Sequence, residues 1–343
     1  MELALSPASS APLRKQDFPG AVAGLRALCD EDLSAVNTTI LSAMRSRAPM
    51  IVDIASHLIN SGGKRLRPLL TLASARLFGY RGEDHVKLAA AVELIHGATL
   101  LHDDVVDASA LRRGESTANI IWGNKESVLV GDYLFAQAFE LMVAAGDLDV
   151  LHILSRASGV IAEGEVLQLS TQKNLDATFE MYLAVVESKT AALFAAATQS
   201  GALIAGADAE SVEALRSFGR NLGVAFQLVD DALDYSGREV SLGKSVGDDF
   251  REGKMTLPVV YAFDRSSGED REFWRRTIAE GRQRPGDFEH ARDLVATTRA
   301  LEDTFACAKR YAARALDDLT AAPVNAYSAQ FAEIAARSVA RVA

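Results

Sequence analysis

The chain has little cysteine, little proline, few aromatic residues and no excess of positive charge. Its two cysteines, Cys29 and Cys307, exclude a disulfide framework as the basis of the fold and fit a reducing compartment. A formal net charge of -10 argues against nucleic acid as the main partner. Only 8 prolines interrupt 343 residues that are 49% hydrophobic, so we expect long helices and a large packed core.

Targeting and membrane signals are also scarce. Residues 1–20 contain no long apolar run typical of a secretion signal, and Glu2 and Asp17 argue against a transit peptide. This segment is rich in Ser, Ala and Pro and is predicted to be a loose tail. No stretch has the quality of a membrane span, because polar residues interrupt the nearest one, residues 191–207, which predicts a buried core helix. We therefore expect a soluble, cytoplasmic protein.

Helical periodicity covers most of the chain, and no run of residues alternates as strands do. Residues 21–343 are therefore predicted to form a single all-α domain. A charged, glycine-bearing segment at 236–254 is the longest irregular stretch after the tail, and loops of that length are often functional. The helices are expected at about residues 22–46, 48–60, 66–78, 84–107, 126–145, 148–169, 177–205, 209–234, 256–263, 269–280, 287–317 and 324–342.

Two of these helices end in the same D-D-x-x-D spacing. Residues four apart lie on one helix face, so each motif extends a polar stripe along a helix that should be apolar. Carboxylates this close repel one another, and Mg²⁺ binds one or two carboxylates together with substrate phosphates. We therefore predict metal ions that grip a diphosphate between the two helices, in preference to two solvated helix ends. The six aspartates are Asp103, Asp104, Asp107, Asp230, Asp231 and Asp234.

Basic residues that could bind a diphosphate gather in two segments. "GGKRLRP" (62–68) places Lys64, Arg65 and Arg67 after two glycines and before an apolar helix, and "LRRG" (111–114) places Arg112 and Arg113 after the first acidic motif. Arginine binds phosphate through a planar fork and lysine as a point charge. Lone lysines are more often surface charges, but three more are candidates: Lys189, Lys244 and Lys254.

Six segments in one order resemble the trans-polyprenyl diphosphate synthases, over about residues 50–260. The likeness is greatest to the long-chain members, the octaprenyl, solanesyl and decaprenyl diphosphate synthases, which make quinone side chains. It implies the isoprenoid-synthase fold, a single helical bundle around a central cavity, and a homodimer. The segments are "GGKRLRP", "LLHDDVVDASALRRG", "EGEVLQL", "SKTAALF", "FQLVDDALDY" and "GKSVGDDFREGKMTLP".

The resemblance also implies a reaction. Two to three Mg²⁺ ions per site would bind an allylic diphosphate, either farnesyl or geranylgeranyl diphosphate, and neutralise the leaving group. Isopentenyl diphosphate would then add head to tail, giving an all-trans product of about C40–C50 that is delivered to a membrane.

Residue roles follow from matched motif positions. The catalytic residues would be the six aspartates and Lys189. Among them, the metal ligands would be Asp103, Asp107, Asp230 and Asp234. Asp248 and Asp249 would be candidates to add to the second metal site. Isopentenyl diphosphate would be held by Lys64, Arg67, His96 and Arg113. The allylic diphosphate would be held by Arg112, Lys189, Thr190, Gln227 and Lys244.

The helix before Asp103 is the expected wall of a tunnel for the growing tail. Ala98 and Thr99 lie about one turn deeper and are small, so they leave the tunnel open. Phe139, Met142 and Leu154 are candidates for its floor. The alternative is that Ala98 and Thr99 only allow close helix packing.

Three alternative functions stay open at this point. A class I terpene cyclase also uses an aspartate-rich helix, although its second motif usually differs from "DDALD". A His-Asp phosphohydrolase could use His57, His96 and His102 with a transition metal. The chain could also be a subunit of a heteromeric synthase, as the catalytic or as a non-catalytic partner, although non-catalytic subunits tend to lose an acidic motif.

Overall fold

The computed structural model describes residues 17–60, 62–236 and 246–340, which are almost entirely helical, as predicted. The first part holds α1 (Phe18–Leu28), α2 (Asp30–Ala43), α3 (Pro49–Asn60), α4 (Leu66–Leu77), α5 (Asp84–Val106), β1 (Leu111–Arg112), β2 (Glu115–Ser116), α6 (Ala118–Ile121) and α7 (Asn124–Ala145). The middle part holds α8 (Leu148–Thr171), α9 (Phe179–Val186), the π-helical η1 (Glu187–Ala191), α10 (Ala192–Ile204) and α11 (Ala209–Tyr235). The last part holds α12 (Asp248–Glu252), α13 (Leu257–Asp264), α14 (Gly268–Trp274), η2 (Arg275–Ala279), α15 (Asp287–Thr297), α16 (Ala300–Asp318), η3 (Leu319–Ala321) and α17 (Ala326–Ser338).

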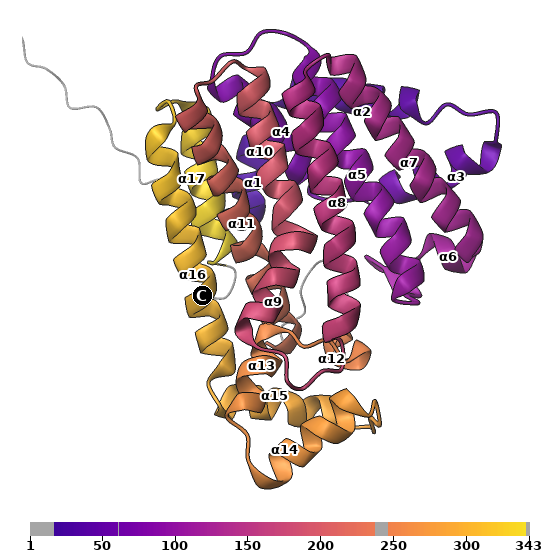
Figure 1. Cartoon of the computed structure of the whole chain (residues 1–343), viewed down its shortest axis with the longest axis vertical. Coiled ribbons are helices and arrows are strands. Elements are labelled where there is room, and N and C mark those ends of the chain that lie inside the picture. Colours follow the sequence, from indigo (N-terminus) through magenta and orange to yellow (C-terminus); the bar gives the residue numbers. More distant parts are fainter. Residues whose placement is uncertain (1–16, 61, 237–245, 341–343) are drawn as a thin grey trace, which may run out of the picture.

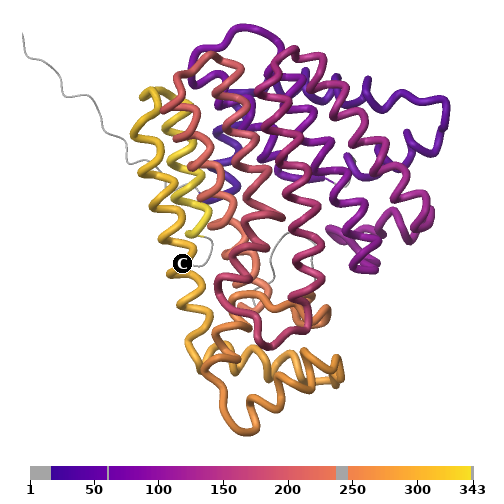
Figure 2. Tube along the Cα trace, in the orientation of Figure 1, coloured from indigo at the N-terminus to yellow at the C-terminus, as the bar shows by residue number. Residues whose placement is uncertain are grey.

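The long helices run side by side along the length of the molecule (Figure 1). The uncharged α10 packs against α4, α5, α8 and α11, which confirms the predicted buried helix at this position. The short helices α12 to α15 lie together at one end (Figure 1). At the side of the bundle, the first and last described helices, α1 and α17, pack against each other (Figure 2).

Two predicted helices are each divided in the structure. The expected helix at 22–46 is split at Cys29 into α1 and α2, and the expected helix at 287–317 is split before α16, where Arg299 has a left-handed φ of 58°. The predicted end of the tail at residue 20 lies inside α1, because the Asp17 side chain caps that helix by accepting from the Gly20 N–H at 2.8 Å. Apolar periodicity alone does not detect such breaks.

The apolar core consists of two clusters of buried side chains. One lies among α1, α2, α4, α5, α7, α8 and α10, and the other among α9, α13, α14, α15 and α16. The helix α11 contributes to both, since Phe218 and Leu222 belong to the first and Leu228 and Val229 to the second. The second acidic motif therefore ends a helix that is held by both clusters.

Two features were not foreseen from the sequence. Residues Leu111 and Arg112 pair with Glu115 and Ser116 in a small antiparallel hairpin directly after the first acidic motif. In addition, α7 is long and apolar enough to cross a membrane, judged by length and composition alone. The prediction that no stretch of the chain could span a membrane was therefore wrong for this helix. One such helix is weak evidence of membrane insertion, because core helices of soluble proteins pass the same test.

Candidate active site

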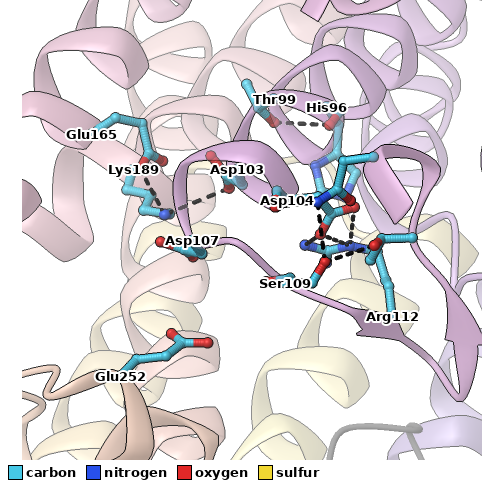
Figure 3. A network of polar contacts seen from close by, with 12 residues as sticks. His96, Thr99, Asp103, Asp104, Asp107, Ser109, Arg112, Glu165, Lys189 and Glu252 are labelled. Atoms are coloured by element: carbon cyan, nitrogen blue, oxygen red, sulfur yellow. Dashed lines mark hydrogen bonds and ion pairs between the residues drawn. The ribbon is translucent and has the colours of Figure 1, made fainter. Parts of the chain in front are cut away.

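The first acidic motif, at the end of α5, divides into two functions. Asp103 and Asp107 lie one turn apart on one face, and each side chain is 15% exposed. Asp104 points the other way and is 3% exposed. It accepts three hydrogen bonds from Arg112, at 2.9 Å and 3.2 Å from Nε and at 2.7 Å from Nη2 (Figure 3). Asp103 and Asp107 therefore form the part of the motif that faces the site, whereas Asp104 anchors the β1–β2 hairpin.

The second acidic motif, at the end of α11, has a similar division. Asp231 is buried and accepts hydrogen bonds from the Tyr182 hydroxyl at 2.5 Å and from Gln227 Nε2 at 2.7 Å. Burial, and then the nearby Asp249 carboxylate, raises the pKa of Asp231 to about 8. The Thr190 hydroxyl donates to Gln227 Oε1 at 2.9 Å, so this network fixes the orientation of the Gln227 amide.

Asp234, predicted as a metal ligand, holds the start of α12. One of its oxygens accepts from the Gly247 N–H at 2.9 Å and the other from the Asp249 N–H at 3.1 Å. A carboxylate at a helix N-terminus is favourable because the free N–H groups there are partly positive. Asp230 is half-buried on α11, the helix that also carries Asp234. The motif thus also sets the position of Asp248 and Asp249 beside it.

Lys254 links the first acidic motif to the α12 segment that Asp234 of the second motif holds. Its ammonium lies 3.2 Å from Asp107 and also pairs with Glu252, while its backbone N–H donates to the Asp249 carbonyl at 2.9 Å. Burial lowers the pKa of Lys254, but the surrounding carboxylates, that of Asp249 foremost, outweigh burial and raise it, so the side chain is charged. The first motif and the segment held by Asp234 therefore face each other across one cation. Lys244, another predicted cation, lies outside the described residues.

Lys189 occupies the other side of the first motif. Its ammonium donates to Glu165 at 2.7 Å and lies 3.5 Å from Asp103 (Figure 3). Burial raises the pKa of Asp103, Lys189 lowers it, and the neighbouring Asp107 raises it again, with a net upward shift. Lys189 and Thr190 lie in the π-helical η1, a rare geometry that is frequent at functional sites. Lys189 therefore reaches toward the first acidic motif, and the next residue, Thr190, reaches toward the second through Gln227.

The predicted cations of "GGKRLRP" lie over aromatic rings. The Lys64 ammonium lies 4.8 Å from the Phe18 ring centroid, and the Arg67 guanidinium lies 4.7 Å from that of Phe194. Phe226 packs against both rings, at 5.9 Å from each. Such cation–π contacts hold a positive side chain in place without neutralising it. Both side chains therefore remain cationic at these rings.

His96 lies next to Arg67, whose Nη1 is 3.1 Å from His96 Nε2. Because arginine only donates, His96 Nε2 accepts this bond and the ring proton lies on Nδ1. Burial, and then the Arg67 charge, lowers the pKa of His96 well below its usual value, so the ring is neutral near pH 7. His96 can therefore donate from Nδ1 but carries no charge of its own.

Two further arginines named from the sequence, Arg65 and Arg113, also lie at this loop. Arg65 forms an ion pair with Glu93 and donates to the Ile59 carbonyl at 3.3 Å, so it braces the loop. A Cβ at Gly63 would lie 3.0 Å from Arg113 Nη1, which places Arg113 directly against the glycine loop. A small enclosed pocket of about 30 Å³ lies here, lined in part by His96, Arg113 and the Arg65–Glu93 pair. His96 therefore lies beside Arg67 and lines the same pocket as Arg113, and Lys64 lies over Phe18 and Phe226. Two of the nitrogens of Arg112 are instead turned to Asp104.

The predicted tunnel residues differ in placement. Ala98 is fully buried, and the Thr99 hydroxyl donates to its own helix at the His96 carbonyl at 2.8 Å. Met142 and Leu154 are both 0% exposed in the first core cluster. Phe139 is instead 40% exposed, so the single chain does not bring it together with the other floor candidates.

The donor set fits hard divalent cations. Asp103 and Asp107 are largely buried carboxylates, and the ammonium groups of Lys189 and Lys254 lie beside them as positive charges. Among the described residues, no group of three or more His, Cys, Asp or Glu side chains converges as a complete metal cage. Mg²⁺ usually takes only one or two carboxylates, plus waters and substrate phosphates, so this incomplete set suits it.

The three histidines that a His-Asp phosphohydrolase would use to bind a metal lie apart in the structure. His57 Nε2 is 2.9 Å from the Ser116 carbonyl, and His102 Nε2 is 3.1 Å from that of Val128. His96 contacts Arg67 instead. A transition-metal site built from these residues is therefore not supported in the described part of the chain.

Comparisons with known proteins agree with this geometry. The sequence pattern of the family described as polyprenyl synthetase matches residues 48–295. The chain is 47% identical over 257 residues to octaprenyl diphosphate synthase of Escherichia coli, which covers 75% of this chain and 80% of that protein. A crystal structure of a decaprenyl diphosphate synthase from Rhodobacter capsulatus has a TM-score of 0.91 at 50% identity, covering 94% of this chain and 99% of that one. A polyprenyl synthase from Caulobacter crescentus, complexed with calcium and isoprenyl diphosphate, has a TM-score of 0.91 at 50% identity, covering 97% and 100%.

Proposed function

This chain belongs to the polyprenyl synthetase family and is a trans-prenyltransferase, and on that premise we propose that it adds isopentenyl diphosphate to an allylic diphosphate until a product of about eight to ten isoprene units is reached. Two observations together support the proposal. Lys254 links Asp107 of the first acidic motif to the α12 segment that Asp234 of the second motif anchors, and a separate group of basic side chains lies around Arg67. A condensation needs both, because each of its two substrates carries a diphosphate. A class I terpene cyclase has only one diphosphate to bind.

Isopentenyl diphosphate is proposed to bind at Lys64, Arg67, His96 and Arg113. Lys64 and Arg67 keep their charge over aromatic rings, and neutral His96 can donate from Nδ1. Since this diphosphate is not the leaving group, its site needs tight positioning and no further activation.

The allylic diphosphate is proposed to lie between Asp103, Asp107 and the second motif, with Lys189 and Thr190 at its side. Two or three bound Mg²⁺ ions would supply Lewis-acid stabilisation of the diphosphate as it leaves. The side chains of Asp103, Asp107 and Asp230 would hold these ions, and Asp234 would act in part through the α12 segment that it anchors. Lys189 would add positive charge where negative charge develops. Lys244, Gln227 and Arg112 remain proposed contributors to the allylic site, with Arg112 limited by its hydrogen bonds to Asp104.

The hydrocarbon tail is proposed to grow along α5, past Thr99, toward Met142 and Leu154. The Lys87 ammonium donates to the Ala144 carbonyl at 3.2 Å, so the end of α7 that bears Met142 lies beside the start of α5. This point is about 24 Å from Asp103 along the helix axis, a length that several isoprene units would span. A quinone side chain is the proposed use of the product, which would pass to a membrane.

A homodimer in the cytoplasm is the proposed assembly and location. Several large apolar side chains on α7 and α8 are exposed in the single chain, among them Leu129, Phe139, Val143 and Val166. Covering them with a second copy would remove apolar surface from water. Phe139 would then be buried by the partner while remaining apart from Met142 and Leu154.

The proposal is tested by measuring incorporation of labelled isopentenyl diphosphate with farnesyl or geranylgeranyl diphosphate as primer. We expect incorporation with Mg²⁺, loss on adding chelator, and recovery when Mg²⁺ is restored. Asp103→Ala and Asp230→Ala should each reduce kcat by at least about a hundredfold. Asp132→Ala, which removes an exposed aspartate on α7, should change it less than twofold. Full activity of either active-site variant would contradict the metal-binding roles.

A further inference from the structure

We propose that Glu165 is a positioning residue that keeps the Lys189 ammonium beside the first acidic motif when divalent cations bind Asp103. The inference deepens the proposed function and rests on it, because it takes Lys189 as a cation for the allylic diphosphate. Glu165 has no role in the assignments above. It acts through Lys189 and touches no reacting atom.

The distances rank the two partners of Lys189. Its Nζ lies 2.7 Å from Glu165 Oε2, within hydrogen-bond range, and 3.5 Å from Asp103 Oδ2 (Figure 3). A divalent cation at Asp103 would compete for that oxygen and repel the ammonium. A lysine held by Asp103 alone would be released at the moment when its charge is needed. The carboxylate of Glu165 keeps it in place.

The backbone fixes the separation between Glu165 and Lys189. A Cβ at Gly164 would lie 2.6 Å from Ser188 Cβ and 2.9 Å from the Lys189 backbone nitrogen, so α8 and η1 touch at this point. Glu165 and Lys189 each lie directly beside this contact in sequence. Because α8 and η1 are this close, the side chains of Glu165 and Lys189 meet over a short distance that the backbone fixes. The flexible lysine side chain alone would not fix this distance.

The other carboxylate oxygen has no competing bond. Glu165 Oε1 is buried and lacks a hydrogen-bond partner among the residues that the structure describes. A buried carboxylate oxygen without a hydrogen bond is unfavourable. Glu165 has such an oxygen, Oε1, while its other oxygen, Oε2, accepts a hydrogen bond from Lys189. Among the described residues, Lys189 is therefore the hydrogen-bond partner through which Glu165 can act.

The first test is chemical and does not depend on catalysis. Acetylation of Lys189 by acetic anhydride is measured by mass spectrometry, relative to the exposed Lys125, with and without Mg²⁺. In the unaltered chain, Mg²⁺ should change Lys189 labelling less than twofold. In Glu165→Gln, which removes the charge but keeps the shape, Mg²⁺ should raise labelling at least fivefold. An equal rise in both proteins would overturn the proposal.

The second test is a double-mutant cycle in the elongation assay. Glu165→Gln should lower kcat about tenfold to a hundredfold, with the KM for isopentenyl diphosphate within twofold, because one charge-assisted hydrogen bond is lost on the allylic side. In a Lys189→Ala background the same substitution should cause no further loss. Glu165→Asp should recover part of the activity, and Glu163→Gln, an exposed control on α8, should retain all of it.

Either of two kinetic results would refute the role of Glu165. One is a kcat of Glu165→Gln within twofold of the unaltered chain, and the other is an additive loss in the Lys189→Ala background. Failure of the proposed function looks different, because the unaltered chain and Glu163→Gln would then also lack elongation activity, while the labelling test would still report on the ion pair.

Discussion

Thr99 is the position at which a single substitution should change product length most. It lies four residues before Asp103 and therefore on the same helix face, about 6 Å deeper along α5. Its hydroxyl is turned back to the His96 carbonyl, so only a methyl group remains to project from the wall. One helical turn, about 5.4 Å, is similar in length to one isoprene unit. A ring at this position would therefore obstruct the tail within the first units.

We expect Thr99→Phe to give products of at most about four isoprene units and to reject geranylgeranyl diphosphate as a primer. Adding a large side chain beside packed helices should cost about 1–3 kcal/mol of folding stability, which thermal unfolding would detect. Thr99→Val has nearly the same volume and should preserve the original length. Ala98→Phe should also shorten the product, at a larger folding cost because Ala98 is fully buried.

The assay is chromatography of dephosphorylated products made from labelled isopentenyl diphosphate. Products of unchanged length from a folded Thr99→Phe protein would refute the tunnel along α5. Small residues at 98 and 99 would then serve helix packing only.

Three other predictions follow from the site. Asp104→Asn should destabilise the fold by about 2 kcal/mol, measured by urea unfolding, because it leaves the largely buried Arg112 pair incomplete. The folded state disfavours protonation of His96, so the contribution of His96 to stability should fall by about 1.4 kcal/mol per pH unit as pH drops below about 6.5, until the lowered folded pKa is reached. The raised pKa of Asp231 acts in the opposite direction over this range, so the His96 contribution is measured in metal-free thermal unfolding as the stability of the unaltered chain minus that of His96→Gln. This difference should fall as pH drops, whereas the same difference for His152→Gln, at an exposed position, should stay constant. Met142→Ala should lengthen the product by at least one isoprene unit in the chain-length assay, and an unchanged length would exclude Met142 from the tunnel floor.

The sequence was most informative where chemistry and spacing coincide. Periodicity predicted an all-helical chain, which the structure confirms. The repeated aspartate spacing predicted two carboxylate groups, and the structure links the first group through Lys254 to the segment that Asp234 of the second group anchors. Family resemblance supplied the fold type, which the comparisons confirm. Both signals depend on side chains that recur at fixed offsets along a helix.

The remaining features depend on tertiary contacts that spacing does not encode. Asp103 and Asp104 are adjacent and chemically identical, yet only packing turns Asp104 to Arg112. Glu165 and Tyr182 bind Lys189 and Asp231 from other helices, and no local pattern relates them. Glu165 lies in "EGEVLQL" (163–169), one of the six segments that carry the family resemblance, and its neighbour Gly164 signals close packing, but neither relates Glu165 to Lys189.

The most direct test of the central claim is the chain length of the products that the unaltered protein makes from labelled isopentenyl diphosphate, farnesyl diphosphate and Mg²⁺. The account predicts a polyprenol of about eight to ten isoprene units that disappears when a chelator is added. No elongation by the folded protein with Mg²⁺, with either farnesyl or geranylgeranyl diphosphate as primer, would contradict a self-sufficient synthase and would indicate a subunit that requires a partner.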